Sequence, residues 1–359
     1  MPATALRSLI VAPNWIGDAV MAQPLLAMMH QRDPAQVIEA LCPPHIAPVF
    51  RAMPEVDTVI EASNAHGRLD LGARWRLARA LHSRRYDRAY VLPNSAKSAL
   101  VPWFARIPRR IGHLGESRHF LLNTIHRAPG STGRRPMVEH YAELAFDPGE
   151  PLPGHVPDPR LVGHPEQEQA ARVKYRLPDD SPLLVLCPGA EYGPAKRWPT
   201  RHFASLSVLL AAEWPYATIV LLGSPKERTM ATEITALAGN PLRNLCGETS
   251  LEEAMAILSQ AAGVVSNDSG LMHLAAAYAR PQVAVFGSSD PRHTPPRSPH
   301  ARVEWLHIEC SPCFARECPL GHLNCLNHLE PDRVMRALRT TVKLEPANRW
   351  RGGQARELD

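Results

Sequence analysis

The amino-acid sequence predicts an α/β protein built from two doubly wound, Rossmann-like domains. Short apolar segments with the composition of buried strands alternate with segments of helical spacing, and this alternation is typical of a parallel sheet covered by helices on both faces. The chain has 359 residues, which is too long for one ordinary hydrophobic core and suits two cores of about 150 residues each. A stretch rich in Pro, Gly and Asp, residues 147–165, divides the pattern into two series and is expected to be the interdomain linker.

The first series forms the expected first domain, residues 1–160. Its apolar runs are short, as buried strands are, and the segments between them place apolar residues at helical spacing. The expected strands are residues 6–12, 37–42, 58–61 and 89–92, and the expected helices are residues 18–30 and 71–81.

The second series forms the expected second domain, residues 161–335, and the end of the last helix with a frayed tail accounts for residues 336–359. Two such domains would face each other across a cleft and bind ligands at the carboxyl ends of their strands. A single large doubly wound sheet is the alternative, which the linker disfavours. The expected strands are residues 183–187, 218–222, 263–266 and 282–286, and the expected helices are residues 202–213, 226–238, 251–259, 270–278 and 331–342.

No apolar run approaches the length of about 18 residues that a membrane-spanning helix needs. The N-terminus also lacks the pattern of a signal peptide, because only Arg7 precedes a short apolar stretch that soon meets Asp18. The cysteines number seven, which is odd, and three of them lie in apolar, strand-like surroundings, so a disulfide framework is not expected. These features favour a cytosolic enzyme with reduced thiols.

The net charge of +5 is unevenly distributed. Residues 66–135 contain 15 Lys or Arg and 3 acidic residues, a balance of +12, so the rest of the chain sums to −7. A basic segment of this kind predicts an anionic partner, which by composition alone is a nucleic acid, a membrane surface or a phosphorylated glycolipid. A solvated basic face is the alternative.

The sequence SNDSGLMH at residues 266–273 is the clearest motif. A buried strand runs into Asp268 and Ser269, both residue types favoured at helix N-caps, then into Gly270 and an apolar helix. A helix that starts there directs free backbone N–H groups and a positive dipole end toward a ligand, and Gly270 lets a diphosphate approach closely. His273 lies in the first turn and would reach the same phosphates. An ordinary capped helix is the alternative.

Two further loops follow buried strands. The loop PGAEYGPAKRWP at residues 188–199 carries Lys196, whose compact ammonium suits a phosphate oxygen, although Arg197 beside it could act similarly. A solvated surface cation is the alternative for Lys196. The loop PNWIGD at residues 13–18 carries Asp18, which would serve as a general base or would merely cap the helix.

Several nucleotide-binding motifs are absent from the sequence. No Asp-x-Asp pair occurs, so a carboxylate clamp for a metal–diphosphate complex has no candidate. There is also no GxxxxGK[ST] phosphate loop, and no GxGxxG follows a strand. These absences argue against a kinase, an ATPase and a typical NAD enzyme.

Taken together, these segments resemble bacterial heptosyltransferases, and the type II enzymes more than type I. The resemblance runs from about residue 9 to residue 334 in the same order. It implies the glycosyltransferase B fold, with the acceptor bound mainly by the first domain and the nucleotide sugar by the second. The segments that carry it are LIVAPNWIGDAVMAQPLL, LPNSAKSALVPWFARIPRRIGH, CPGAEYGPAKRWP, SNDSGLMHLAAA and CSPCFARECPLGHLNC.

The activity that the resemblance implies is an inverting, metal-independent transfer of L-glycero-D-manno-heptose from ADP-heptose to the inner-core heptose of lipopolysaccharide. The acceptor is anionic and embedded in a leaflet, so the basic segment would also make peripheral contact with the cytoplasmic face of the inner membrane. No nucleic-acid partner is expected, because the arginines lie on no recognition motif.

Site residues carried over from the resemblance fall into three groups. Asp18 matches the catalytic base and Lys196 the catalytic, donor-phosphate lysine. The remaining donor-binding candidates are Glu227, a weaker match to a ribose-binding acid, and Asp268, Ser269, Gly270, Leu271 and His273. The acceptor-binding candidates are Asn14, Asn94, Ser95, Lys97 and Arg110.

Four cysteines near the C-terminus, Cys310, Cys313, Cys318 and Cys325, have the spacing C-x2-C-x4-C-x6-C. Four thiols this close are a candidate site for zinc or an iron–sulfur centre, although the second pair lacks the C-x2-C spacing of zinc ribbons. A structural role is favoured over a catalytic one, and metal occupancy is left open. No cofactor is expected to be required for the reaction.

Other functions remain open at this stage. A transferase for another sugar, a type I acceptor preference or a nucleotide-sugar epimerase would keep the fold, although an epimerase needs no second anionic substrate. A non-catalytic nucleotide-binding module would leave Asp18 as a cap.

Overall fold

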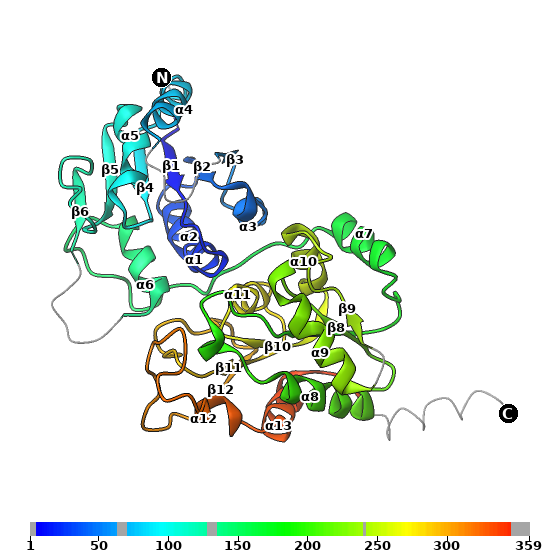
Figure 1. Cartoon of the computed structure of the whole chain (residues 1–359). Helices are drawn as coiled ribbons and strands as arrows, with labels where there is room; N and C mark the ends of the chain where they lie inside the picture. The colour runs from blue at the N-terminus through cyan, green and yellow to red at the C-terminus, as the bar shows by residue number, and fades with distance from the viewer. Residues whose placement is uncertain (1–4, 63–69, 128–134, 240–241, 346–359) are drawn as a thin grey trace. The chain divides into compact units, whose positions relative to one another are not determined.

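The computed structural model describes residues 5–62, 70–127, 135–239 and 242–345. The chain divides into two compact units, Met1–Val162 and Gly163–Asp359, hereafter unit 1 and unit 2 (Figure 1). The expected frayed tail and the ends of the basic segment, residues 66–69 and 128–134, lie outside the described residues. In the part of the chain that is described, no helix has the length and apolar character needed to cross a membrane.

Unit 1 contains a six-stranded parallel sheet in the order β3-β2-β1-β4-β5-β6. Its strands are β1 (Arg7–Val11), β2 (Val37–Cys42), β3 (Thr58–Glu61), β4 (Arg88–Val91), β5 (Arg109–His113) and β6 (Thr124–His126). Its α-helices are α1 (Ile16–Met21), α2 (Gln23–Arg32), α3 (Ala47–Arg51), α4 (Leu71–His82), α5 (Leu100–Phe104) and α6 (Met137–Ala142).

Unit 2 repeats this topology with the order β12-β11-β10-β7-β8-β9, again all parallel. Its strands are β7 (Leu183–Cys187), β8 (Thr218–Leu221), β9 (Arg243–Asn244), β10 (Ala261–Asn267), β11 (Gln282–Phe286) and β12 (Ala301–Trp305). Its α-helices are α7 (Pro165–Tyr175), α8 (Thr200–Glu213), α9 (Arg228–Ala238), α10 (Leu251–Leu258), α11 (Gly270–Ala277), α12 (Asn324–Asn327) and α13 (Pro331–Thr341).

Both sheets have the 3-2-1-4-5-6 strand order of dinucleotide-binding folds when strands are counted within each unit. The order reverses between β1 and β4 in unit 1 and between β7 and β10 in unit 2. Loops that leave adjacent strands at such a point diverge to opposite faces and leave a crevice for ligands. The predicted class, two Rossmann-like α/β domains with parallel sheets, is confirmed.

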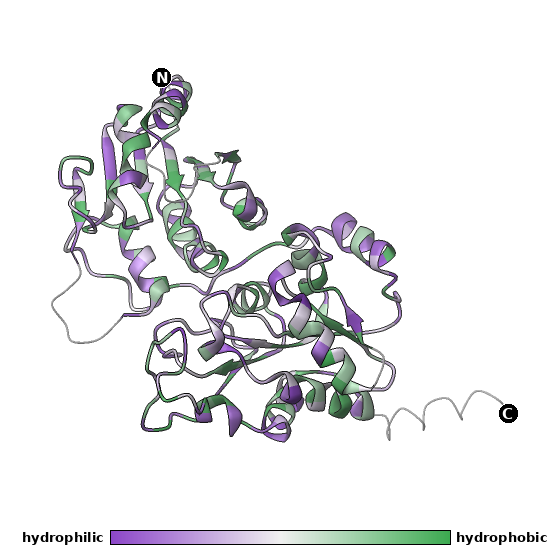
Figure 2. Cartoon of the chain, viewed as in Figure 1, coloured by the Kyte–Doolittle hydropathy of each residue, from purple (hydrophilic) through white to green (hydrophobic). Residues whose placement is uncertain are grey.

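Alternation along the strands builds a core on each face of the sheet in unit 2. Val283 and Val285 of β11 pack with the core formed by α8, α9 and α13, whereas Ala284 and Phe286 pack with Met272 of α11. Successive side chains of a strand point to opposite faces, so β11 is buried on both. A helix that covers the sheet buries its hydrophobic residues and leaves hydrophilic residues outside the core. Figure 2 shows residues of both kinds on α9.

One predicted helix is divided into two in the structure. The expected single helix at residues 18–30 is two helices, α1 and α2, which meet at Ala22. Pro24 is the second residue of α2, where its missing N–H is tolerated, but in an unbroken helix its ring would clash with the carbonyl of Val20. The break makes α1 a short helix that starts directly after the first strand.

Several elements were not predicted from the sequence, namely β5, β6, β9, β12, α3, α5, α6, α7 and α12. Most are short, and β5 begins with two arginines and contains a glycine, so it lacks the apolar run that marks a buried strand. Its pairing to β4 supplies the stability that its own sequence does not.

A buried arginine connects β5 to the loop after β4. Arg118 has no exposed side-chain surface, and its guanidinium donates to backbone carbonyls of His113 (3.1 Å) and Pro93 and to the side-chain oxygen of Asn94 (3.4 Å). Burial lowers the pKa of Arg118, although the Glu116 carboxylate opposes this. A cation counted in the basic segment is therefore part of the interior of unit 1.

We predict that Arg118→Met lowers the free energy of unfolding of unit 1 by about 2 kcal/mol or more, because several buried carbonyls lose their donor. In a domain of this size the melting temperature falls by about 2–4 °C for each kcal/mol. Differential scanning calorimetry of the full chain measures the change. The exposed Arg76→Met on α4 is the matched control and should melt like the parent. Equal melting of the two variants would show that Arg118 is dispensable.

Candidate functional site

Most of the predicted site residues follow the two strands between which the order reverses in each unit, whereas Glu227 follows β8 and Arg110 lies on β5. In unit 1, Asn14 and Asp18 follow β1, and the segment from Asn94 to Lys97 follows β4. In unit 2, Lys196 lies on the loop after β7, and the segment from Asp268 to His273 follows β10. The two segments of unit 2 come together at a single ion pair.

Lys196 and Asp268 form that ion pair. Lys196 Nζ lies 2.5 Å from Asp268 Oδ2, and the hydroxyl of Ser289 donates to the same carboxylate oxygen over 2.5 Å. The lysine side chain keeps 17% of its surface exposed, whereas that of Asp268 keeps only 5%. The structure therefore gives Asp268 the role of a buried partner that orients the ammonium, and the helix N-cap is Ser269.

Asn267, which the sequence analysis overlooked, fixes the loop that carries Lys196. Its side-chain oxygen accepts a hydrogen bond from Trp198 N over 3.0 Å, and its amide nitrogen donates to the carbonyl of Pro188 over 2.6 Å. The residue is fully buried at the end of β10. A polar residue that ends an apolar strand was the available signal, because a buried amide requires partners.

The start of α11 has the features of an anion site. Ser269 occupies the N-cap position without a side-chain capping bond, and its Oγ has no hydrogen-bond partner among the described residues. Gly270 and Leu271 open the helix, whose first N–H groups have no acceptor within the helix. His273 is buried, and burial lowers its pKa to about 4, so the ring is neutral near pH 7. The positive charge of this site therefore comes from the backbone N–H groups at the start of α11 and from Lys196.

Glu227 has a structural role in the present geometry. It is buried, and its Oε2 accepts hydrogen bonds from the backbone N (2.6 Å) and the hydroxyl (2.5 Å) of Ser224, as part of a capping box before α9. Its side chain lies against the loop after β7, since a Cβ at Gly189 would come 2.8 Å from Glu227 Cδ. Its expected contact with ribose stays a prediction.

Asp18 in unit 1 is the third residue of α1 and is not the N-cap, which is Trp15. Tyr141 of α6 forms a hydrogen bond with Asp18. The pKa of Tyr141 lies well above its usual value, chiefly through burial and further through the charge of Asp18 and the hydrogen bond to it. A tyrosine that stays protonated donates its hydroxyl, so the Asp18 carboxylate accepts and is held by α6.

Only three of the five acceptor-binding candidates line a common pocket. A pocket of about 80 Å³ at the carboxyl end of the unit 1 sheet is lined by Asn14, Ser95 and Lys97. It is also lined by Arg74, a buried arginine of α4 that was not predicted and that donates to the carbonyl of Lys97 over 3.0 Å. The sequence around Arg74 predicts only a helix. The contact with the loop that carries Lys97 arises in the folded chain, where α4 packs beside that loop.

Two acceptor candidates have other roles. Arg110 does not line this pocket, and its guanidinium donates to the carbonyls of Leu121 (2.7 Å) and Ile107 (2.6 Å). Asn94 is also absent from the lining and accepts from Arg118 as described above. Arg110 thus holds the segments that flank β5, and Asn94 shares its side-chain oxygen with Arg118, while the acceptor contacts expected of both residues stay predictions.

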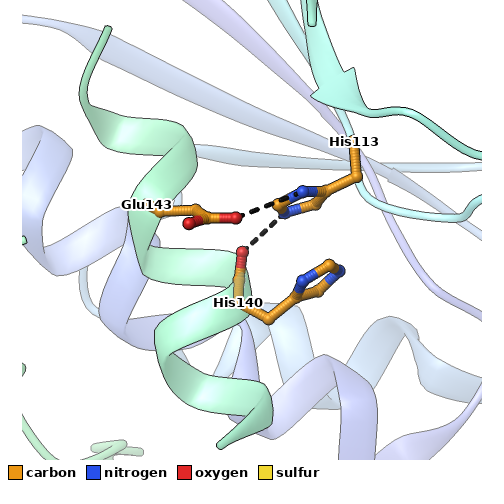
Figure 3. A group of neighbouring side chains, drawn as sticks. All are labelled: His113, His140 and Glu143. Atoms are coloured by element: carbon orange, nitrogen blue, oxygen red, sulfur yellow. Dashed lines mark hydrogen bonds and ion pairs between the residues drawn. The ribbon is translucent and has the colours of Figure 1, made fainter. Parts of the chain in front are cut away.

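A polar cluster beside Tyr141 joins His113, at the end of β5, to His140 and Glu143 (Figure 3). His113 Nε2 lies 2.6 Å from the His140 carbonyl, and its Nδ1 lies 3.3 Å from Glu143 Oε1. The rings of His113 and His140 stack with centroids 3.6 Å apart and planes 15° apart.

These three residues are the one group within the described ranges whose possible ligand atoms lie within 4.8 Å of one another. However, the lone pairs of an imidazole lie in its ring plane, so two stacked rings do not point at one ion. Burial lowers the pKa of His113 to about 3, which makes the ring neutral. The cluster serves as a packed contact that fixes α6, and with it Tyr141.

Comparison with known proteins gives concordant results. The chain matches the family model described as glycosyltransferase family 9 (heptosyltransferase) over residues 74–324. It is 39% identical to lipopolysaccharide heptosyltransferase 2 of Escherichia coli over 351 residues, which cover 95% of this chain and 100% of that protein. It is 40% identical to lipooligosaccharide heptosyltransferase 2 of Haemophilus influenzae over 309 residues, which cover 83% and 88% of the two chains.

Among solved structures, ADP-heptose lps heptosyltransferase II of E. coli aligns with a TM-score of 0.83 and 38% identity. The alignment covers 94% of this chain and 98% of that one. Both the resemblance noted in the sequence and the α/β fold class are confirmed by these matches.

We predict that Asn267→Ala destabilises unit 2 by about 2 kcal/mol or more, because a buried N–H and a buried carbonyl lose their partner together. Asn244→Ala on β9 removes one such bond, to Cys246 N, and is the matched control with a smaller expected loss. Chemical denaturation followed by tryptophan fluorescence measures both. A variant at position 267 that unfolds at the same denaturant concentration as the parent would contradict the role given to this amide.

Proposed function

Because the chain belongs to glycosyltransferase family 9, the heptosyltransferases, we propose that it transfers L-glycero-D-manno-heptose from ADP-heptose to the inner-core heptose of lipopolysaccharide. The observation that carries this proposal is the similarity to heptosyltransferase 2 along almost the whole of both chains. Support also comes from the positions of Asp18 and Lys196, each at the point where its sheet reverses strand order.

The donor half of the reaction belongs to unit 2. When the bond between the sugar and the diphosphate breaks, negative charge builds on the departing phosphate. The ammonium of Lys196 and the N–H groups at the start of α11, from Ser269 onward, would stabilise that charge. Asp268 orients the ammonium, so the cation is in place before the donor binds. His273 is neutral and would act as a hydrogen-bonding group for the phosphates.

The acceptor half belongs to unit 1, where Asp18 would accept the proton of the attacking hydroxyl. The acceptor oxygen forms a bond to the anomeric carbon on the face opposite the diphosphate, the proton passes to the Asp18 carboxylate, and ADP leaves with the bonding electrons. This single displacement inverts the configuration at the anomeric carbon. Tyr141 donates to Asp18 and thereby fixes the direction in which the carboxylate faces.

The transfer is proposed to need no metal ion at the diphosphate. The sequence offers no Asp-x-Asp clamp, and Lys196 with the α11 amides supplies the positive charge that a divalent cation would otherwise provide. Since these groups belong to the protein, the donor site would function without added magnesium.

The proposed acceptor is anionic, and two cations of unit 1 would meet it. Lys97 and Arg74 line the pocket at the carboxyl end of the unit 1 sheet and would pair with phosphate or carboxylate groups of the lipopolysaccharide core. Arg85 and Arg106 line a second pocket of about 360 Å³ beside His82, at the opposite end of the sheet. We assign these exposed arginines to peripheral contact with the anionic inner face of the cytoplasmic membrane.

The deciding experiment is to incubate the purified chain with ADP-heptose and a series of truncated lipopolysaccharides and to weigh the products. A mass increase of one heptose on the acceptor that already carries one inner-core heptose supports the proposal. Transfer only to the acceptor without heptose would indicate a type I preference. Consumption of the donor without an acceptor product would indicate a different reaction.

We predict that Asp18→Asn lowers turnover by about two orders of magnitude or more while ADP binding and melting stay near those of the parent. The amide keeps the shape of the carboxylate and still accepts from Tyr141, but it cannot take the proton. Steady-state kinetics and isothermal titration with ADP measure the two properties. Parental turnover in this variant would mean that the base lies elsewhere.

Tyr141→Phe is the matched variant, because it keeps the base and removes one donor to it. We expect turnover to fall about fivefold to tenfold, which corresponds to one hydrogen bond of about 1 kcal/mol. The acid limb of the pH–rate profile should move to higher pH, because the charged carboxylate loses a stabilising partner. An unchanged acid limb would reduce Tyr141 to a packing role.

We also predict that ADP binds equally well with magnesium and after brief exposure to EDTA, within about a factor of two, since the phosphates meet Lys196 and backbone amides. Titration calorimetry measures the affinity, and the protein-bound metal is quantified in the same samples. A loss of affinity of about 10-fold or more in a sample that keeps its protein-bound metal would contradict metal-independent donor binding.

A further inference from the structure

Neither half of the proposed reaction uses the four clustered cysteines. Cys310, Cys313 and Cys318 lie between β12 and α12, and Cys325 lies on α12 in the core of unit 2. All four are free thiols, of which Cys325 is buried and Cys313 is exposed. Ser311, next to Cys310, donates to the carbonyl of Gly287, and a Cβ at Gly287 would come 2.7 Å from Cγ of Leu326, next to Cys325. The segments that carry Cys310 and Cys325 are therefore neighbours in unit 2.

The backbone around Cys318 is arranged to receive a negative sulfur. The chain folds back after Cys318, where Gly321 N donates to the carbonyl of Cys318 over 3.1 Å and brings the backbone of residues 320–323 near the sulfur. The left-handed backbone at Gly321 (φ 72°) and Leu323 (φ 50°) turns the chain around the sulfur. Backbone N–H groups that converge on a thiolate are a common supporting arrangement for a metal ligand.

The same segment supports the donor loop. Between Cys313 and Cys318, the carbonyl of Phe314 accepts from the hydroxyl of Tyr192 over 2.7 Å, and the carbonyl of Arg316 accepts from Ala195 N over 3.0 Å. Ala195 immediately precedes Lys196, whose ammonium also lies 5.0 Å from the ring centroid of Tyr192. Whatever fixes the cysteine segment therefore also fixes the position of the donor lysine.

The backbone at Gly193 lies so close to the backbone at Arg316 that a side chain would not fit between them. A Cβ at Gly193 would come 2.4 Å from the carbonyl oxygen of Arg316, so only glycine allows the two segments to touch. The segment is anchored on its other side, where Phe314 N donates to the carbonyl of Ser288 over 2.7 Å. A second anchor is the hydroxyl of Ser311, which donates to the carbonyl of Gly287 over 2.6 Å.

We propose that Cys310, Cys313, Cys318 and Cys325 bind one zinc or iron ion, which holds the segment between them in place and thereby positions Lys196 through Phe314 and Arg316. Four thiolates in a tetrahedron suit zinc or iron and few other biological cations. The ion crosslinks a segment that has little regular secondary structure between β12 and α12.

The sulfurs do not form a group within 4.8 Å of one another in the described structure. Metal–sulfur bonds of about 2.3 Å place the four sulfurs of a tetrahedral site about 3.8 Å apart. Because no three of the four sulfurs form such a group, at least two side chains must move to close the site. Cys313 is exposed and Cys310 is half-buried, and both lie in the irregular segment between β12 and α12, whereas Cys325 is held in the core.

Metal content is the first measurement, and it requires no heptosyl transfer. The full chain is purified under reducing conditions from cells grown with both zinc and iron, and each metal is quantified by plasma mass spectrometry. We expect about one equivalent of a single metal per chain, and iron would add visible thiolate-to-metal absorption. A chain without stoichiometric metal, or one in which these cysteines are joined by disulfides, overturns the proposal.

Single variants then assign the ligands. Cys313→Ser and Cys318→Ser should lower metal affinity by about 10-fold or more, whereas Cys246→Ser, a buried thiol outside the segment, should keep the full equivalent. Full metal content in both segment variants overturns the assignment. Should a variant fail to fold, a mercurial titration of the parent replaces it: metal release in proportion to the blocking of these four thiols supports the site, and release unrelated to them overturns it.

The link to Lys196 has its own readout. Titration with ADP should show weaker binding by Cys318→Ser than by Cys246→Ser, because the donor loop loses its support. If Cys318→Ser has lost its metal but binds ADP as tightly as Cys246→Ser, the metal does not position Lys196. If the chain binds metal and ADP as expected but transfers no heptose, the proposed activity fails and the metal site stands.

Discussion

The side chain of Asn267 joins the two strand ends on which the proposed donor site depends. The loop after β7 has little regular structure of its own, and Asn267 reaches across from β10 to bind the backbone at both Pro188 and Trp198. Lys196 lies within the bracketed loop, and Asp268 follows Asn267 directly. One buried amide therefore sets the separation of an ammonium and a carboxylate that come from distant parts of the chain. The order of the parallel strands, in turn, brings these two ends side by side.

Charge in the basic segment is divided among three tasks, which a count of residues does not reveal. Arg118 and Arg110 satisfy backbone carbonyls inside unit 1, and Arg74 lines the small pocket beside Lys97. Arg84 pairs with the buried carboxylate of Glu39. Internal arginines of this kind stabilise the loops that present the ligand-facing groups, so removing them would change the shape of the site as well as its potential.

The sequence was sufficient to predict the fold class, most long strands and helices, and the loops that carry Asp18, Lys196 and Asp268. These features are local, since an apolar run followed by a turn and a helix start is visible in a single segment. The partners of these residues were not predictable, because Tyr141, Ser289 and Asn267 come together with them only through long-range packing. Short elements such as β5 and α6 were missed for a related reason, namely that their stability comes from their neighbours.

Each unit has its own sheet, its own core and its own reversal of strand order. The core residues of unit 1 and those of unit 2 form separate clusters. In the proposed division of the reaction, unit 2 binds the donor and unit 1 the acceptor, so recombination near residue 162, where the two units divide, would pair the donor site of one enzyme with the acceptor site of another.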